Sequence, residues 1–230
     1  MWRKIVNNAI VPTLFVSVGA LSTIAITDIS RQQTRPTTLP AKSEEVMISY
    51  DISQYDQIFR SIGEKYSIDW RLLSAIARAE SEFRFDAVSK AGAVGLMQVM
   101  PLVAHNMGYE REALFDVETN VEIAAQLLIE NNKMLRLAND VDKEERLKFI
   151  LACYNAGYPR IADARNLAQY HDENDESWSI VSTYLSLLSE PEFANHEVVR
   201  SGAFHGSNET ITYVNKVIHI YNMYCNRIVL

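Results

Sequence analysis

The sequence predicts a mainly α-helical domain. Apolar residues recur with helical spacing in nearly every stretch after residue 50, as in Leu73, Ile76 and Ala77 at positions i, i+3 and i+4. No stretch alternates apolar and polar residues clearly enough to predict a strand. The chain has 230 residues, of which 48% are hydrophobic, and this is enough for one well-packed domain with extensions.

Capping residues and glycines set the limits of the expected helices. Asp69 and Asp116 stand where a side chain can accept the first backbone amides of a helix, and Gly157 stands where a helix can end. Pro101 requires a short first turn or a kink in the third helix. The acidic residues 171–176 are expected to form a solvated connection. The expected helices cover residues 52–66, 70–81, 95–107, a stretch that begins after Asp116, 143–156, 160–170, 177–188 and 208–224.

Charge, histidine and cysteine content exclude some classes of protein. The formal net charge is −7, so no nucleic-acid partner is expected, because the basic surface that phosphate binding requires is missing. The five histidines are scattered and lack the spacing of a metal site, so no metal is expected. Cys153 and Cys225 are the only cysteines. An exported chain could pair them, but apolar neighbours favour a buried free thiol at Cys153.

The first 50 residues differ from the rest of the chain. Arg3 and Lys4 precede the uncharged residues 5–27, a segment long enough to cross a bilayer, since a span takes about 17–25 residues. The pattern fits a cleaved signal peptide as well as a retained anchor, and both stay open. We therefore expect a signal peptide or membrane anchor in residues 1–30, a polar linker in 31–50 and one exported domain in 51–230.

A carboxylate continues the apolar face of the second expected helix. Glu80 follows Leu73 at i+7 and Ile76 at i+4, so its side chain is expected to be buried near the end of the helix. Burial disfavours the charged form and raises the pKa of a carboxyl group. An acid that is still protonated near neutral pH can give a proton to a leaving group. Position alone, however, more often indicates a partly exposed residue or one that is paired with a cation.

The stretch that begins at Glu80 carries a longer pattern. It reads Glu-Ser-x-Phe from residue 80 and Ala-x-Ser-x-x-Gly-Ala-x-Gly-Leu-Met-Gln from residue 87, with Pro101 three residues later. Glycines at such points let the backbone turn tightly or approach a ligand closely, and Gln98 supplies an amide with two donors and an acceptor. The pattern resembles the signature of the soluble-type lytic transglycosylases, relatives of goose-type lysozyme in glycoside hydrolase family 23.

Three further segments are similar to that family and occur in its order. Residues 152–157 read Ala-Cys-Tyr-Asn-Ala-Gly, where the family has Ala-x-Tyr-Asn-Ala-Gly, although Tyr154 alone would be a core aromatic and Asn155 a capping residue. Residues 209–214 read Glu-Thr-x-x-Tyr-Val, and Glu209 alone would be an acidic residue that the helix dipole favours. Residues 116–121 resemble Asp-Pro-x-x-Asn-Ile, and a capped core helix accounts for them without any chemistry.

The resemblance implies a fold, a reaction and a site. The fold is a lysozyme-like α domain with a substrate cleft between helical lobes. The reaction is cleavage of the β-1,4 bond between N-acetylmuramic acid and N-acetylglucosamine in peptidoglycan, with formation of 1,6-anhydro-muramoyl ends. Glu80 is implied as the sole catalytic acid and base, and the implied reaction requires no cofactor. The implied substrate-binding residues are Ser89, Met97, Gln98, Tyr154, Asn155, Glu209 and Tyr213.

Two other functions stay open beside this one. The first is a muramidase that hydrolyses the same bond, as in goose-type lysozyme. The second is a non-catalytic peptidoglycan-binding component of a secretion or conjugation apparatus, although such a component would not need an acid at Glu80. The expected partners are peptidoglycan glycan strands, the membrane if the N-terminal segment is retained, and proteins of the cell-wall or secretion machinery. The expected location is the periplasm or the periplasmic face of the membrane.

Overall fold

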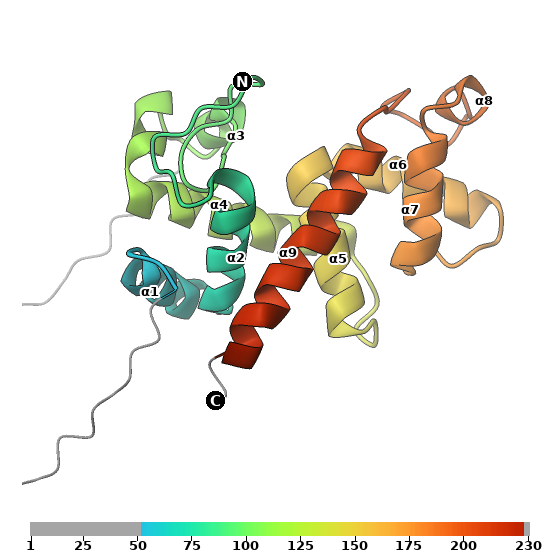
Figure 1. Ribbon diagram of the computed structural model, residues 1–230. Coiled ribbons are helices and arrows are strands. Elements are labelled where there is room, and N and C mark those ends of the chain that lie inside the picture. The colour runs from blue at the N-terminus through green and yellow to red at the C-terminus, as the bar shows by residue number, and fades with distance from the viewer. Residues whose placement is uncertain (1–51, 228–230) are drawn as a thin grey trace, which may run out of the picture. The chain divides into compact units, whose positions relative to one another are not determined.

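The computed structural model describes residues 52–227, and this part of the chain is helical without a strand. The predicted signal or anchor segment and the linker lie outside the described residues. Figure 1 shows the helices in order: α1 (Asp56–Tyr66), α2 (Trp70–Ser81), α3 (Pro101–Asn106), the 3₁₀ helix η1 (Arg111–Phe115), α4 (Val117–Leu135), α5 (Lys143–Ala156), α6 (Tyr158–Tyr170), α7 (Trp178–Leu187), α8 (Pro191–Ala194) and α9 (Ser207–Arg227). Within residues 52–227, no helix combines the length and the apolar character that crossing a membrane requires.

The long helix α9 organises this arrangement. It packs against α2, α5 and α7, and Figure 1 shows it running diagonally with α1 to α4 on one side and α6 to α8 on the other. The core residues Leu73 and Ile76 of α2, Phe149 of α5 and Val217 of α9 are fully buried. Apolar side chains from both sides therefore meet along α9, and their burial is the main favourable contribution to folding.

Most of the expected helix limits are confirmed. The side chain of Asp69 accepts the backbone amide of Arg71 at 3.0 Å, and that of Asp116 accepts the amide of Thr119 at 2.9 Å. Both carboxylates therefore cap the helices that follow them. Gly157 ends α5 with a φ of 84°, a conformation in the left-handed region that glycine adopts without strain.

Two expected helices begin later than predicted. Residues 52–55 do not join α1, because the Asp56 carboxylate reaches back and accepts the amides of Ile52 and Ser53 at 2.6 and 2.9 Å. The helix expected from residue 95 begins only at Pro101. Proline is well tolerated at the first position of a helix. Before it, Val94 and Val99 exchange backbone hydrogen bonds at 2.9 and 3.0 Å. This short antiparallel pairing takes the place of the first two expected turns. The short helices η1 and α8 were not predicted.

Neither cysteine is in a disulfide, as expected for Cys153. Burial raises the pKa of the Cys153 thiol to about 12, so the thiol stays protonated at neutral pH. It is therefore a packing residue rather than a nucleophile.

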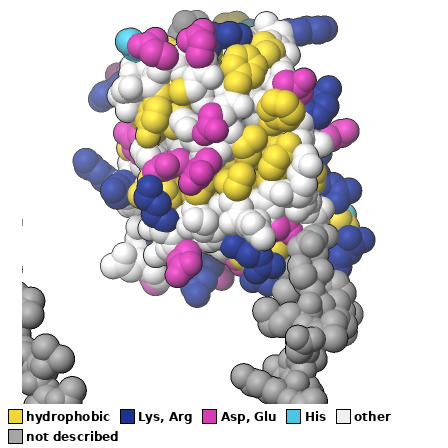
Figure 2. All heavy atoms as spheres, turned by 90° about the vertical axis from the view of Figure 1, so that its left-hand side faces the viewer, with side chains coloured by type: hydrophobic (Ala, Val, Ile, Leu, Met, Phe, Trp, Pro, Cys, Tyr) yellow, Lys and Arg dark blue, Asp and Glu magenta, His cyan; other side chains and the backbone are white. Residues whose placement is uncertain are grey.

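Large exposed apolar side chains gather on the segment between α2 and α3 and at the start of α3. Phe85, Val88, Met100 and Leu102 are each at least 41% exposed. Figure 2 shows the face that α1, α3 and α4 form, with hydrophobic side chains spread over its upper part between acidic ones. The apolar surface on this face is therefore broken up by charge.

Candidate active site

Glu80 lies in the last turn of α2, and its side chain is half-buried. Burial is the largest influence on this carboxyl and raises its pKa from 4.5 to about 7, and the nearby charge of Glu209 adds to the increase. The Tyr213 hydroxyl and the Lys216 ammonium act in the opposite direction. The group is thus close to half protonated at neutral pH, as an acid that also serves as a base requires.

Two tyrosines from different helices flank this carboxyl. Tyr154 of α5 donates a hydrogen bond to the Met97 carbonyl at 2.8 Å, and Tyr213 of α9 is 8% exposed. Burial, and then the charge of Glu80, raises the pKa of both phenols well above the usual value. The Tyr213 hydroxyl lies close enough to Glu80 to favour the carboxylate but completes no hydrogen bond within the described residues. It can therefore donate to Glu80 or to a ligand after a small movement.

The backbone leaves α2 abruptly after Glu80. Glu82 and Phe83 both adopt the left-handed conformation, with φ values of 54° and 64°, and Gln98 does so at the other end of the loop with a φ of 50°. Non-glycine residues in this region cost free energy and concentrate at functional sites. The buried Ser81 hydroxyl donates to the Leu96 carbonyl at 2.7 Å and thereby joins the two ends of the loop beside Glu80.

Asn120 of α4 holds the second half of this loop, which leads to α3. Its side-chain oxygen accepts the amide of Met97 at 2.7 Å, and its nitrogen donates to the carbonyls of Val94 and Leu114 at 3.0 Å each. Gly95 packs directly on this amide, since a Cβ atom there would lie 2.5 Å from the Asn120 nitrogen. Asn120 is fully buried. No role at the site was expected for Asn120, although an asparagine on an apolar helix face indicates a side chain that holds backbone groups.

The residues predicted in the loop have different surroundings. The Gln98 amide donates to the carbonyls of Ala87 and Gly95 at 3.1 and 2.9 Å, so its oxygen is left for a ligand. The Ser89 hydroxyl accepts the amide of Ala93 at 2.9 Å, and the side chain is half-buried. Met97 is fully buried. Its side chain packs in the core and its carbonyl holds Tyr154, so we no longer count Met97 among the substrate contacts.

Asn155 lies at the end of α5, and Glu209 lies at the start of α9. The Asn155 oxygen accepts the Thr210 hydroxyl at 2.8 Å, which joins the two helices. Both Asn155 and Glu209 are exposed. The charge of Glu209 adds to the increase in the pKa of Glu80, so the two carboxylates lie near each other. Residues of the motifs on α5 and α9 therefore lie near Glu80 of α2, and Tyr154 and Ser81 tie the loop before α3 to the same place.

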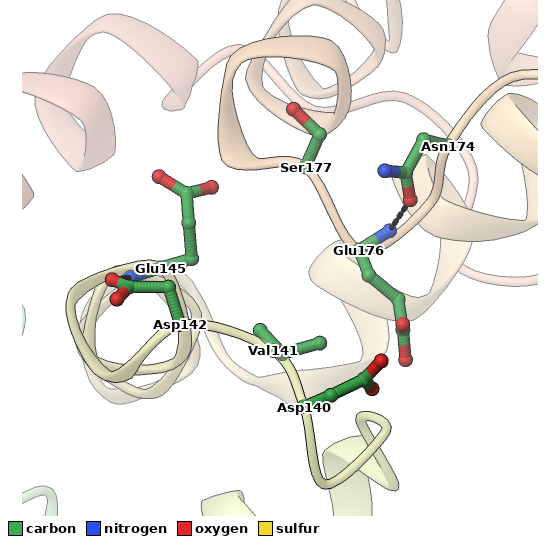
Figure 3. Close-up of a pocket in the computed structure, with 7 residues that line it drawn as sticks. All are labelled: Asp140, Val141, Asp142, Glu145, Asn174, Glu176 and Ser177. Atoms are coloured by element: carbon green, nitrogen blue, oxygen red, sulfur yellow. Dashed lines mark hydrogen bonds between the residues drawn. The ribbon is translucent and has the colours of Figure 1, made fainter.

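An acidic pocket of about 360 Å³ lies between the start of α5 and the loop that precedes α7 (Figure 3). Asp142 caps α5, Glu145 accepts the amide of Trp178 at 2.7 Å, and Glu176 accepts the amide of Ala138 at 2.7 Å. These carboxylates are thus engaged in holding the backbone. Within residues 52–227, no group of three His, Cys, Asp or Glu side chains has the arrangement of a metal site. The prediction of a reaction without metal stays a prediction.

Comparison with known families decides the classification. A family model described as the transglycosylase SLT domain matches residues 57–177, which is more than half of the chain. The chain belongs to this family. The matched part of the SLT domain includes Glu80, the loop after it and Tyr154, and it ends before α9.

Similar proteins place the SLT domain within longer chains. The membrane-bound lytic murein transglycosylase F of Marinobacter nauticus is 30% identical over 174 residues, which are 75% of this chain and 33% of the relative. That of an Enterobacter species is 38% identical over 134 residues, 57% of this chain and 25% of the relative. The chain thus spans a third or less of the length of these relatives.

A solved structure confirms the expected fold. It is the lytic transglycosylase Slt of Pseudomonas aeruginosa, determined as an inactive Glu-to-Gln mutant. The TM-score is 0.50 at 19% sequence identity, and the match covers 75% of this chain and 24% of that chain. The lysozyme-like, mainly helical architecture predicted from the sequence is therefore the architecture of this SLT domain.

Proposed function

We propose that this SLT domain is a peptidoglycan lytic transglycosylase, which cleaves the β-1,4 bond between N-acetylmuramic acid and N-acetylglucosamine. The observation that carries the proposal is the Glu80 carboxyl, whose burial raises its pKa to about 7. A carboxyl with this pKa is protonated often enough at neutral pH to be an acid and ionised often enough to be a base. The relatives that are named as lytic murein transglycosylases support the same activity.

The reaction proceeds in two steps on this one carboxyl. Glu80 first gives its proton to the glycosidic oxygen, and the bond from that oxygen to C1 of the muramoyl residue breaks, with assistance from the 2-acetamido group of the sugar. The Glu80 carboxylate then takes the proton of the 6-hydroxyl of the same sugar, whose oxygen closes on C1. The product is a 1,6-anhydro end, and Glu80 regains its proton without the use of water.

The surrounding residues would hold the sugar against this carboxyl. The Gln98 oxygen, the Ser89 hydroxyl and the Asn155 amide are polar groups at partly exposed or exposed positions. Glu209 is a second carboxylate, and its charge raises the pKa of Glu80. We assign Tyr154 and Tyr213 to the positioning of the Glu80 carboxyl and of the sugar that leaves when the glycosidic bond breaks. Both hydroxyls belong to helices that pack in the core and are therefore held in place.

The alternatives differ in their products. A hydrolase of the muramidase type would use a water molecule, and ordinary glycosidases use a second carboxylate for that purpose. A binding component of a secretion or conjugation apparatus would cleave nothing.

We infer further that the domain acts outside the cytoplasmic membrane, because residues 5–27 carry no charge behind Arg3 and Lys4. An alkaline phosphatase fusion after residue 50 should be active, and a stable inactive fusion would contradict export.

Mass spectrometry of peptidoglycan digests tests the proposal. Anhydro-muramoyl ends are expected from the wild-type chain, and they should be absent after incubation with the Glu80→Gln variant. Reducing ends would show a hydrolase instead. If the folded wild-type chain bound peptidoglycan and released no fragment, the binding component would be the correct function.

A further inference from the structure

The α8–α9 segment, residues 195–206, connects these two helices and leads directly into the first turn of α9. It contains no helix or strand of its own. The first turn of α9 carries Glu209, whose charge adds to the increase in the pKa of Glu80. The place of Glu209 beside Glu80 therefore depends on where the α8–α9 segment sets the start of α9.

A buried carboxylate of α6 holds the middle of the α8–α9 segment. Asp163 is 2% exposed, and its two oxygens accept the backbone amides of Arg200 and Ser201 at 2.9 and 2.8 Å. Within residues 52–227, Asp163 forms no salt bridge. Burial of a carboxylate is costly unless hydrogen bonds compensate for it. The two amides supply this compensation, and the same bonds attach the segment to α6.

Arg160 provides a second attachment on α6, three residues before Asp163. Its guanidinium donates to the carbonyls of Ser201 and Gly202 at 2.5 and 3.0 Å, and it lies 5.5 Å from the centre of the Phe204 ring. The Phe204 amide donates at 2.9 Å to the carbonyl of residue 188, at the end of α7. The backbone of this short stretch is thus held through both its amides and its carbonyls.

From Phe204 the contacts continue into α9. Gly206 packs against the Phe204 ring, since a Cβ atom at Gly206 would lie 2.8 Å from the ring atom Cζ. The Gly206 carbonyl accepts the amide of Thr210 at 3.0 Å and its hydroxyl at 3.1 Å. The same hydroxyl lies 2.8 Å from the Asn155 side-chain oxygen at the end of α5. A continuous set of contacts therefore leads from α6 to Thr210, the neighbour of Glu209.

We propose that Asp163 is a positioning residue of the site, which sets the place of Glu209 relative to Glu80 by holding the α8–α9 segment. The proposal rests on the proposed function, since it assigns Glu209 to the cleft that binds the sugar. Asp163 is too deeply buried to touch a substrate, and it belongs to none of the motifs found in the sequence. A site that is held in place before binding loses less entropy when the ligand arrives.

Asp56 offers a matched control for Asp163. It is 4% exposed, and its carboxylate also accepts two backbone amides, at 2.6 and 2.9 Å, but these belong to the residues before α1. Asp163→Asn and Asp56→Asn should both lower the free energy of unfolding, because each puts an amide nitrogen where an acceptor is needed. Only Asp163→Asn should lower kcat/KM of the folded enzyme on peptidoglycan, by about 10- to 100-fold, the cost of a small displacement of a group at the site.

A double-mutant cycle with Glu209→Gln shows whether Asp163 acts through Glu209, because contacts alone do not demonstrate coupling. Independent substitutions multiply their effects on kcat/KM. If Asp163 positions Glu209, then Asp163→Asn should change kcat/KM by no more than about twofold in a chain that already carries Glu209→Gln. Multiplied effects would overturn the proposal. So would an unchanged kcat/KM in Glu209→Gln, or equal losses in Asp163→Asn and Asp56→Asn.

A measurement without turnover separates this proposal from the proposed function. The backbone NMR signals of Glu209 and Thr210 should move in Asp163→Asn and stay in place in Asp56→Asn, and unmoved signals in both would overturn the positioning role. If Asp163→Asn does not fold, Arg160→Met takes its place in every comparison, because it removes the bonds to the carbonyls of Ser201 and Gly202. If the wild type cleaved no peptidoglycan, the proposed function would fail, and the NMR comparison would still decide whether α6 places the start of α9.

Discussion

At the scale of single residues, Glu80 is governed by opposing influences. Burial at the end of α2 and the charge of Glu209 raise its pKa, whereas Tyr213 and Lys216 lower it, and the result is a pKa of about 7. A deeper position without cations would keep the carboxyl protonated and prevent it from acting as a base. A fully solvated position would leave too little acid at neutral pH. The chemistry thus depends on how α9, which supplies all three of these neighbours, packs against α2, which carries Glu80.

Replacement of Glu80 by glutamine should abolish turnover while the fold persists. Glutamine keeps the shape and the hydrogen-bonding capacity of the acid but cannot give a proton to the glycosidic oxygen. The loss of general acid catalysis alone should cost roughly 10²- to 10⁴-fold in rate. Muropeptide release measures the effect, and circular dichroism checks the fold. The control is Glu130→Gln, which changes an exposed residue of α4. Retention of more than about a tenth of wild-type turnover would exclude Glu80 as the acid.

Tyr213→Phe should move the alkaline limit of activity to higher pH. The Tyr213 hydroxyl favours the Glu80 carboxylate, so its removal raises the pKa of Glu80 and keeps the acid protonated at higher pH. The pH profile of kcat/KM reports this pKa in the free enzyme. Tyr221→Phe is the matched control, because that hydroxyl bonds to Asp69 at 2.9 Å rather than acting on Glu80. A profile that stays in place, or moves to lower pH, would contradict the contact between Tyr213 and Glu80.

The sequence predicted some site residues better than others. The structure brings Glu80 and the two tyrosines together, and each of them lies in one of the sequence motifs. Their roles in a reaction stay predictions. Met97 was assigned to the substrate by resemblance, although its side chain packs in the core. Asn120 was overlooked, because its three partners are backbone groups in segments up to 26 residues away. Periodicity and capping rules describe neighbours in sequence and carry no information about such distant pairs.

At the scale of elements, helices with a capping side chain were predictable and the loop after α2 was not. Asp69 and Asp116, which were predicted as caps, each accept a backbone amide of the helix that follows. The loop instead depends on left-handed backbone at Glu82, Phe83 and Gln98, residues that do not favour this conformation. Tertiary bonds from Ser81 and Asn120 compensate for this cost. Local preference therefore predicted helix from residue 95, and tertiary contacts produced a paired loop.

Asn120→Ala should damage both stability and activity through this loop. Alanine would leave the Met97 amide and the carbonyls of Val94 and Leu114 without their partner in a buried place. We expect a loss of about 2–4 kcal/mol in the free energy of unfolding, since each buried unsatisfied group costs about 1–3 kcal/mol and relaxation recovers part of it. Urea denaturation measures the loss, and muropeptide release in the folded variant measures activity. Asn132→Ala, on the exposed side of the same helix, is the control. An Asn120 variant as stable as this control would show that the loop does not depend on the amide.

At the scale of the whole described domain, the site forms where chain segments far apart in sequence come together. The C-terminal ends of α2 and α5, the start of α9 and the loop before α3 each supply one part of it, and α9 joins them because it packs on both α2 and α5. Burial of one carboxyl at this junction has a consequence for the entire fold. The stability of the domain is linked to the proton on Glu80.

Stability should fall as the pH rises through the range in which Glu80 ionises. The folded state holds this proton up to a pKa of about 7, whereas the unfolded chain releases it near the ordinary value of 4.5. Between these values the folded state binds more protons, so the free energy of unfolding decreases with pH, and the penalty is complete above about pH 7. Glu80→Gln has no such proton. The free energy of unfolding of this variant should therefore equal that of the wild type near pH 4.5. At pH 8 it should exceed the wild-type value by at most about 3 kcal/mol. The excess is smaller to the extent that solvent reaches the half-buried Glu80 side chain. Urea denaturation of both proteins at several pH values, with Glu130→Gln as the control, gives this difference. A difference that does not change with pH would show that folding leaves the pKa of Glu80 unaltered.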